Sequence, residues 1–301
     1  MRSPAATSGI SRNGGWVSWR SALTFPAVLG MVCLFLAPFI VFFVYSFLTS
    51  GLYTASGPLT LDNYREAVSS PLYRELAKNS AIVGLLAAFV TVLVGLPVAF
   101  WIRFAAGRWQ VAVLFLFTAT LFASYLVRIY AWRTMLGEQG LINSALEQLG
   151  VTKSPIGILL FNRFAVTVAL VHIFLPYMIL VLFAALRSIP AELLEIAEDL
   201  GARASGIWRR VILPQVAAPT GTAFLFVFVL SASDYVTPQF LGGTDGSMLG
   251  VGIQQAFVSL GNWPLGAALS VLMLIAFALC YLLTMLGVRL MRRGPSNAEL
   301  S

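Results

Sequence analysis

The sequence predicts an all-α integral membrane protein with six transmembrane helices. Two observations predict this fold class: the composition is that of a membrane protein, and six apolar segments are each long enough to cross a bilayer. Of the 301 residues, 59% are apolar and 10% are charged, and the mean hydropathy is +0.87. Soluble domains are about 45–50% apolar and about 25% charged, so the composition excludes a soluble globular enzyme.

The six segments follow from the length that a spanning helix needs, which is about 20 mainly apolar residues. They are residues 23–49, 79–102, 110–131, 164–186, 216–241 and 264–288. The first segment follows several arginines, as a signal peptide would. No charge occurs between Arg20 and Asp62, however, which makes the apolar run too long for a signal sequence. We therefore expect a retained anchor helix.

The basic residues predict that both termini lie on the cytoplasmic side of the membrane. With that orientation, 12 of the 19 Lys and Arg residues fall in inner segments. Arg103 and Arg108 occupy a very short inner loop, the outer loop 242–263 has no basic residue, and the outer loop 132–163 carries three opposing charges. The net charge of +7 is thus a topology signal and no sign of nucleic-acid binding. The predicted domains are a cytoplasmic tail over 1–22, a spanning domain over 23–291 and a cytoplasmic tail over 292–301.

Scarce cysteine, histidine and lysine residues exclude several chemistries. Cys33 and Cys280 lie in apolar runs, which is not the pattern of a disulfide framework. His172 is the only histidine, so a zinc-binding histidine pair cannot form. Neither Lys78 nor Lys153 belongs to a G-x-x-x-x-G-K-[ST] phosphate loop. We expect a chain that is not itself an enzyme, holds no metal or cofactor and does not hydrolyse ATP.

Two outer segments are expected to form short helices of their own. Residues 61–78 are predicted to make one or two helical turns at the surface. Residues 138–150 carry a single apolar stripe, which is typical of a helix that lies along the membrane interface.

The most informative segment is the inner loop 187–215, between the fourth and fifth predicted spans. Pro190 suits the first position of a helix, and the acids that follow favour the N-terminal half of that helix. These acids are Glu192, Glu195, Glu198 and Asp199. Gly201 ends the helix as a C′ glycine would. A second short helix is expected from Ser205 through Arg210, closed by Pro214.

The first of these two helices is amphipathic. Its apolar stripe consists of Leu193, Ile196, Ala197 and Leu200. An ordinary solvated loop would explain the glycine and the charges, but not a two-helix unit between two spans. Helices that bind a lipid surface tend to have a basic polar face, whereas this polar face is acidic. The stripe therefore favours a groove in a protein partner.

The same loop resembles a known motif. Glu195-Ile196-Ala197, Gly201 four residues later, and then nine residues before Val211-Ile212-Leu213-Pro214 resemble E-A-A-x-x-x-G-(x9)-I-x-L-P. That signature belongs to the permease subunits of bacterial binding-protein-dependent ABC importers. Ile196 replaces the first alanine and Val211 the isoleucine. The resemblance implies the type I ABC importer permease fold and an ATPase-docking role for Glu195, Ala197, Gly201, Ala202, Leu213 and Pro214.

Three further segments narrow the resemblance. Residues 126–132, 140–143 and 233–243 are similar to spermidine/putrescine-type permeases, in particular to their first permease component. The resemblance implies a bacterial inner-membrane protein that forms half of a pathway for a polyamine, although relatives of this type are assigned to other small solutes. It also implies a homologous second permease, two copies of an ATPase subunit that hold ATP and Mg²⁺, and an extracytoplasmic solute-binding protein, all in contact with membrane lipid and without nucleic acid.

Asp234 is a candidate contact for the solute. It follows Pro214 by twenty residues, or about 30 Å of helix, which places it near the outer mouth of the fifth span. Ionisable groups in spans are functional candidates by default. A carboxylate beside Tyr235 suits an ammonium group through ion pairing and cation–π contact. The alternative is a carboxylate that caps the following turn.

Arg128 is a second candidate, at the outer end of the third span beside Tyr125 and Trp132. Such a group is typical of an aromatic belt with a snorkelling arginine. Alternatively, Arg128 pairs with Asp234 and forms a gate. We expect His172, in the fourth span, to pack or to form a hydrogen bond.

Two other classes of membrane protein remain as alternatives. A secondary transporter driven by an ion gradient would need buried acids near the middle of the membrane and inverted repeats, and neither is clear in the sequence. A membrane enzyme would need a cluster of carboxylates or histidines at one face, whereas most of the acids are scattered and residues 195–199 are better explained by docking. Copurification with an ATPase subunit distinguishes the three classes.

Overall fold

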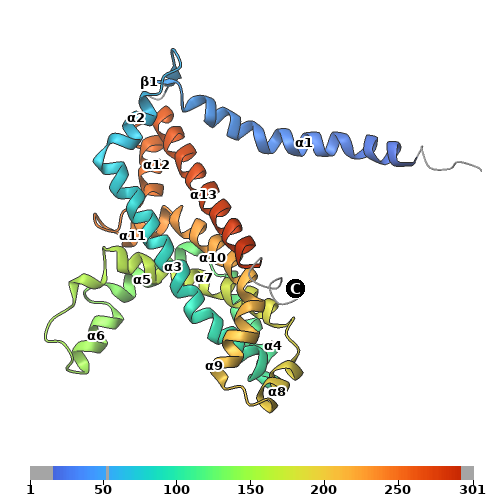
Figure 1. Ribbon diagram of the computed structural model, residues 1–301. Coiled ribbons are helices and arrows are strands. Elements are labelled where there is room, and N and C mark those ends of the chain that lie inside the picture. Colours follow the sequence, from blue (N-terminus) through green and yellow to red (C-terminus); the bar gives the residue numbers. More distant parts are fainter. Residues whose placement is uncertain (1–15, 52–53, 293–301) are drawn as a thin grey trace, which may run out of the picture.

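The computed structural model describes residues 16–51 and 54–292, and this part of the chain is almost entirely helical (Figure 1). The exception is a small antiparallel hairpin of β1 (Thr49–Gly51) and β2 (Thr54–Ser56). The predicted all-α class is confirmed. The greater part of the predicted N-terminal tail and nearly all of the C-terminal tail lie outside the described residues.

Five of the described helices are long and apolar enough to cross a membrane. They are α1 (Trp16–Tyr45), α3 (Pro71–Phe104), α7 (Arg163–Leu186), α10 (Leu213–Ala232) and α13 (Trp263–Arg292). A bent pair of helices is apolar and long enough only when its two parts are taken together, so the described residues hold six spans if this pair counts as one.

The predicted continuous span 110–131 is wrong, because the bent pair interrupts it. α4 (Gln110–Leu121) stops and α5 (Tyr125–Leu136) starts in a new direction, and the helical segments Gly107–Leu121 and Tyr125–Gln148 that contain them make an angle of 94°. Ser124 has an extended backbone with ψ of 133° at the start of α5. Serine favours such helix starts over helix interiors, and no change in hydropathy announces the break.

Two other boundaries differ from the prediction. α3 begins at Pro71, eight residues before the expected start, because proline suits the first helical turn after the extended Ser70. Only α2 (Asp62–Ser69) therefore remains as a short surface helix in the segment 61–78. The expected span 216–241 stops at Ala232, and α11 (Val236–Leu241) is a separate helix.

The loops that follow carry helices as well. The outer segment 138–150 contains α6 (Leu141–Gln148), as expected, and the loop 242–263 contains α12 (Leu249–Val258). From Thr24 to Tyr45, α1 contributes no buried residue; its C-terminal part contacts α13, and its N-terminal part extends away from the other helices (Figure 1).

α3, α7 and α10 pack together at the centre of the protein. Small residues let these helices approach closely, as is common between membrane helices. A Cβ atom added at Gly84 of α3 would lie 2.8 Å from the Cβ atom of Ala232 on α10, so only glycine fits there. Fully buried Ala87, Ala88 and Ala169 continue this close packing along α3 and α7.

The two ends of the bundle are distinct. At one end, where α3 finishes and α4 begins, lie α8 (Ala191–Asp199) and α9 (Ala204–Ile207), while α2, α11 and α12 lie at the other (Figure 1). At that other end, Asn79 Nδ2 donates hydrogen bonds to the carbonyl oxygens of Asp245 (3.1 Å) and Ser247 (2.9 Å). The Ser80 hydroxyl accepts one from the Leu249 N–H group (2.9 Å). These bonds fix the 242–248 loop on α3.

Candidate functional site: a two-helix knob and an Asp234 cluster

Residues 189–212, which we call the knob, begin with a helix that ends in a Schellman motif. Gly201 has φ of +77°, as a C′ residue does. Its N–H group donates to the Glu198 carbonyl oxygen at 2.8 Å, and the Ala202 N–H group donates to that of Ala197 at 2.9 Å. The prediction that Gly201 ends the helix is confirmed, and Ala202 contributes its backbone N–H group.

α8 has one apolar side that packs inward and another that is exposed. Leu194 and Ala197 pack against the core. Leu193, Ile196 and Leu200 are 40%, 55% and 83% exposed. The acids Glu192, Glu195, Glu198 and Asp199 are exposed as well. An exposed apolar stripe flanked by acids is what a docking partner would cover, and of the four stripe residues expected from the sequence only Ala197 faces the core.

The second half of the knob differs from the prediction. Ser205 lies inside α9, which begins after Arg203, a residue with an extended backbone. Pro214 does not close the helix, because a wide π turn (Trp208–Ile212) leads from α9 into α10. There the Leu213 N–H group bonds five residues back, to the Trp208 carbonyl oxygen. Proline has no N–H group and so cannot make the usual helical hydrogen bond. The wide turn accommodates this missing bond, and the helix continues past Pro214.

The knob is attached to the end of α3. Arg103 Nη2 donates a hydrogen bond to the Ile189 carbonyl oxygen (3.3 Å), and the Ile189 side chain is fully buried. The rings of Phe100 and Trp208 lie 4.8 Å apart between their centroids. Ile212 of the π turn is also fully buried. The knob is therefore held to α3 by these contacts and continues directly into α10.

Asp234 caps α11. Its Oδ1 atom accepts a hydrogen bond from the Val236 N–H group (3.0 Å), and Oδ2 accepts bonds from the Thr237 N–H group (3.1 Å) and the Tyr125 hydroxyl (2.8 Å). Asp234 is half-buried and Thr237 fully buried. This geometry is the capping alternative, and it explains why the expected span ends before Asp234.

Arg128 lies near this cluster but is bound elsewhere. Its Nη1 atom donates to the Ile173 carbonyl oxygen (3.4 Å) and Nη2 to that of Ala123 (3.3 Å). Its guanidinium lies 5.9 Å from the centre of the Tyr125 ring. Within the described ranges no ion pair joins Arg128 to Asp234, so the suggested gate is not formed in this conformation.

The other candidates of the outer region also have defined places. The Trp132 Nε1 atom donates a hydrogen bond to His172 Nδ1 (3.1 Å), which confirms His172 as a hydrogen-bonding residue and ties α5 to α7. Tyr235 is 45% exposed beside the capped turn. In residues 16–51 and 54–292, no group of three His, Cys, Asp or Glu side chains is arranged to hold a metal ion.

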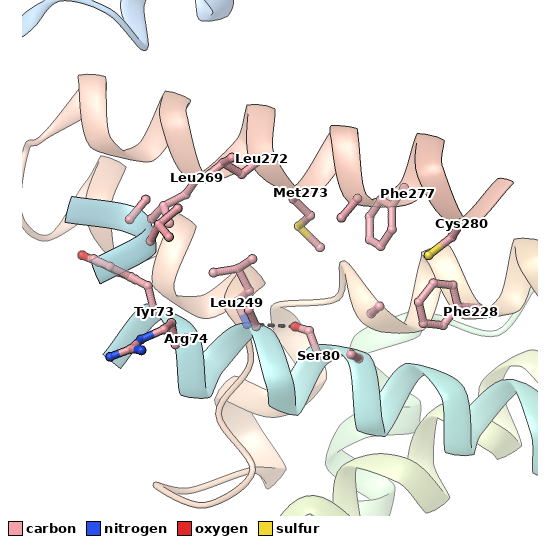
Figure 2. Close-up of a pocket in the computed structure, with 16 residues that line it drawn as sticks. Tyr73, Arg74, Ser80, Phe228, Leu249, Leu269, Leu272, Met273, Phe277 and Cys280 are labelled. Carbon is pink, nitrogen blue, oxygen red and sulfur yellow. Dashed lines mark hydrogen bonds between the residues drawn. The ribbon is translucent and has the colours of Figure 1, made fainter. Parts of the chain in front are cut away.

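A cavity of about 400 Å³ lies between α3 and α13 and is also lined by residues of α2, α10 and α12 (Figure 2). Sequence reasoning missed it, because its walls come from helices far apart in the chain. Apolar side chains such as Leu272, Met273 and Phe277 form most of its lining, and Arg74 is the one charged lining residue. The cavity therefore offers shape and apolar contact, and little that would recognise a charged solute.

Comparison with known proteins now decides the family. The family model described as the binding-protein-dependent transport system inner membrane component matches residues 67–296. This chain belongs to that family. It is the permease subunit of an ABC importer, a multi-pass protein of the inner membrane and a transport subunit, not a catalytic one.

Several curated relatives of this permease are similar over most of their length. The spermidine/putrescine transport system permease protein PotB of Haemophilus influenzae is 32% identical over 245 residues, which are 81% of this chain and 85% of the relative. PotB of Escherichia coli K12 is 30% identical over 78% of this chain and 84% of its own. The E. coli permease YdcU is 28% identical and covers 83% of this chain and 87% of its own.

Solved structures agree with the type I permease fold. A chain of a bacterial ABC transporter that imports the acidic polysaccharide alginate superposes with a TM-score of 0.76 at 15% identity, over 93% of this permease and 99% of that chain. A chain of the MetNI methionine ABC transporter gives a TM-score of 0.53 at 17% identity, over 72% and 95%. At these identities the likeness concerns the fold alone.

Proposed function

We propose that this permease forms half of the membrane pathway of a polyamine importer, and that the knob couples the pathway to an ATPase subunit. The exposed stripe of Leu193, Ile196 and Leu200 carries the proposal, because a soluble partner would bury it. The flanking acids add charge that a basic rim on the partner would complement. ATP and Mg²⁺ would then reside on that partner.

The orientation of the permease is part of the same proposal. The count of basic residues favours a cytoplasmic knob and cytoplasmic termini. The opposite end, with α2, α11 and α12, would receive the solute from an extracytoplasmic binding protein. A homologous second permease would complete the pathway, and two ATPase subunits would dock from the cytoplasm. Closure of the ATPase pair would move the knob, and with it α3 and α10.

Docking can be tested by placing a charge in the stripe. Leu200→Glu should abolish copurification of the ATPase subunit with the tagged permease, because a carboxylate would be buried in an apolar contact. Leu59→Glu is the matched control, since Leu59 is 74% exposed and distant from the knob in sequence, and it should leave copurification intact. Normal recovery of the ATPase subunit with Leu200→Glu would contradict the docking role.

The polyamine substrate is supported by the PotB relatives, which are named as spermidine/putrescine permeases. The test is ATP-dependent uptake of labelled spermidine and putrescine by proteoliposomes that hold the assembled importer and its binding protein. Saturable uptake is expected. Uptake of an unrelated solute, with no uptake of either polyamine, would assign the permease to another cargo while leaving the docking role intact.

The Asp234 cluster is proposed as the outer end of the pathway. Asp234 is already held by three donors, so its first role is to shape the turn into α11. Its remaining lone-pair capacity, together with the exposed Tyr235 ring, provides an anionic and aromatic surface for an arriving ammonium group. Tyr125, Arg128 and Trp132 would position this surface from α5.

A further inference from the structure

One face of α10 is unusual for a membrane helix. Its residues follow each other at intervals of three or four, which places them on the same side of the helix. They are Gln215, Pro219, Thr222, Phe226, Leu230 and Ser233. Gln215, Thr222, Phe226 and Leu230 are exposed, and Pro219 and Ser233 are partly exposed. Three of the six are polar, although this helix is expected to lie within the bilayer.

The exposed faces of α4 and α13 are apolar instead. On α4 the exposed residues include Val111, Phe115 and Leu116, and on α13 Leu274, Ile275 and Leu279. The best apolar window of the helix that includes α10 has a mean hydropathy of 1.7, against 2.4 to 2.8 for the other four long helices. Lipid tails offer no hydrogen-bond partner to the Gln215 amide or to the remaining lone pairs of the Thr222 and Ser233 hydroxyls, so this face suits a polar surrounding better than lipid.

The length of this face matches the membrane. From Gln215 to Ser233 it extends about 27 Å at about 1.5 Å per residue, close to the hydrocarbon thickness of about 30 Å. It begins beside Pro214, two residues after the end of the knob, and finishes next to Asp234. One continuous surface thus connects the two sites described above.

An aromatic pair interrupts this face midway. Phe226, 46% exposed, stacks on Tyr177 of α7 with ring centroids 4.7 Å apart and an angle of 29° between the rings. Counted from the start of each helix, both lie about 20 Å along. Within the described part of the chain the Tyr177 hydroxyl makes no hydrogen bond. A phenol at this depth needs water or another polar group beside it.

We propose that this face of α10 lines the solute pathway, and that the Tyr177–Phe226 pair is the contact that an organic cation makes midway across. The ring faces attract an ammonium group, and the methylene groups between the amines pack on the same rings. The Thr222 and Ser233 hydroxyls, which already donate to backbone carbonyl oxygens of α10 at 3.1 and 2.8 Å, keep free lone pairs that accept from the passing ammonium groups. The choice of a cation rests on the proposed function, whereas the choice of the face does not.

Accessibility tests the pathway without reference to the cargo. In the assembled importer, with Cys33→Ala and Cys280→Ala to remove both native thiols, Thr222→Cys should react with a cationic, membrane-impermeant methanethiosulfonate reagent. Phe115→Cys, on the apolar face of α4 and 73% exposed in the single subunit, is the control that should not react. Labelling of neither residue, or of both equally, would overturn the pathway assignment.

Transport kinetics test the cation contact. Phe226→Leu should raise the KM for spermidine about three- to tenfold, as expected for the loss of one cation–π contact, while Phe226→Tyr should keep it near the wild-type value. An unchanged KM in Phe226→Leu, in an importer that transports spermidine, would overturn the contact. If the wild-type importer moves no polyamine, the proposed cargo fails, and the cation contact with it. The labelling pattern still decides whether the face lines the pathway.

Discussion

The indole ring of Trp208 packs against the ring of Phe100, with centroids 4.8 Å apart, and this contact joins the π turn of the knob to the last turns of α3. The ring centroids of Phe100 and Phe104, on the same helix, also lie 4.9 Å apart. The knob is therefore braced by rings on α3 as well as by its covalent continuation into α10. Movement of the knob should reach both helices together.

Removing this brace should uncouple ATP hydrolysis from transport. Trp208→Ala deletes the ring while leaving the exposed stripe of α8 in place, so we expect the ATPase subunit still to bind. Solute transported per ATP hydrolysed should fall about two- to tenfold, as expected for the loss of an aromatic contact of about 0.5–1.5 kcal/mol. Trp208→Phe, which keeps a ring, is the control. The test is a parallel measurement of the ATPase rate and of solute uptake in proteoliposomes. An unchanged ratio of uptake to ATP hydrolysis in Trp208→Ala would contradict the role of this ring contact in coupling.

The end of α8 provides a second prediction. Gly201→Ala should destabilise the knob by about 1–2 kcal/mol, because a Cβ atom disfavours φ of +77°. The cause is backbone strain alone, since an added Cβ atom would meet no atom within 4 Å. Gly201→Asn should cost less, since asparagine tolerates this conformation. Amide hydrogen exchange of α8 in the purified complex measures this loss of stability. Equal protection of α8 in the wild type, Gly201→Ala and Gly201→Asn would contradict the prediction.

The cap of α11 gives a third prediction, through the Tyr125–Asp234 hydrogen bond. Asp234→Ala removes the acceptor for two backbone N–H groups and one hydroxyl, and it should lower the melting temperature of the detergent-purified permease by more than Tyr125→Phe does. A capping side chain contributes about 1 kcal/mol and a buried hydrogen bond a similar amount. Because both variants break one shared bond, the double variant should lose less than the sum. Strict additivity would show that the two side chains act independently.

Structural features that depend on neighbouring residues could be predicted from the sequence, whereas features that depend on contacts between distant segments could not. Gly201 was placed correctly because a C′ glycine depends on its own turn. Pro214 was taken as a stop because proline usually ends a helix, yet the π turn before it lets the helix continue. The break at Ser124 carries no glycine, proline or change in hydropathy, and the helix after it packs against α7 and α11, which are distant in sequence.

The membrane boundaries show the same distinction. Residues 61–78 were expected to form only short turns at the surface, but Pro71 begins α3 and the helix continues through this segment, where Glu75 and Lys78 pair at 3.8 Å. For Asp234 the sequence left two interpretations, and three hydrogen-bond donors that converge on its carboxylate identify the cap. The α10 face was invisible because its polarity becomes apparent only when the exposed side is known.

Asn79 gives the last prediction, at the end of the bundle away from the knob. This side chain is 1% exposed, and its amide donates to the carbonyl oxygens of Asp245 and Ser247. Asn79→Asp has nearly the same shape but directs an acceptor at two acceptors, whereas Asn79→Leu removes the polar group. A buried group left without a partner costs about 1–3 kcal/mol, and more if it is charged. We therefore expect Asn79→Asp to destabilise the permease more than Asn79→Leu does. It should also increase proteolysis of the 242–248 loop in membrane vesicles that expose this end of the bundle to the protease. Loop cleavage at the wild-type rate in Asn79→Asp would show that the loop is fixed by its glycine backbone instead.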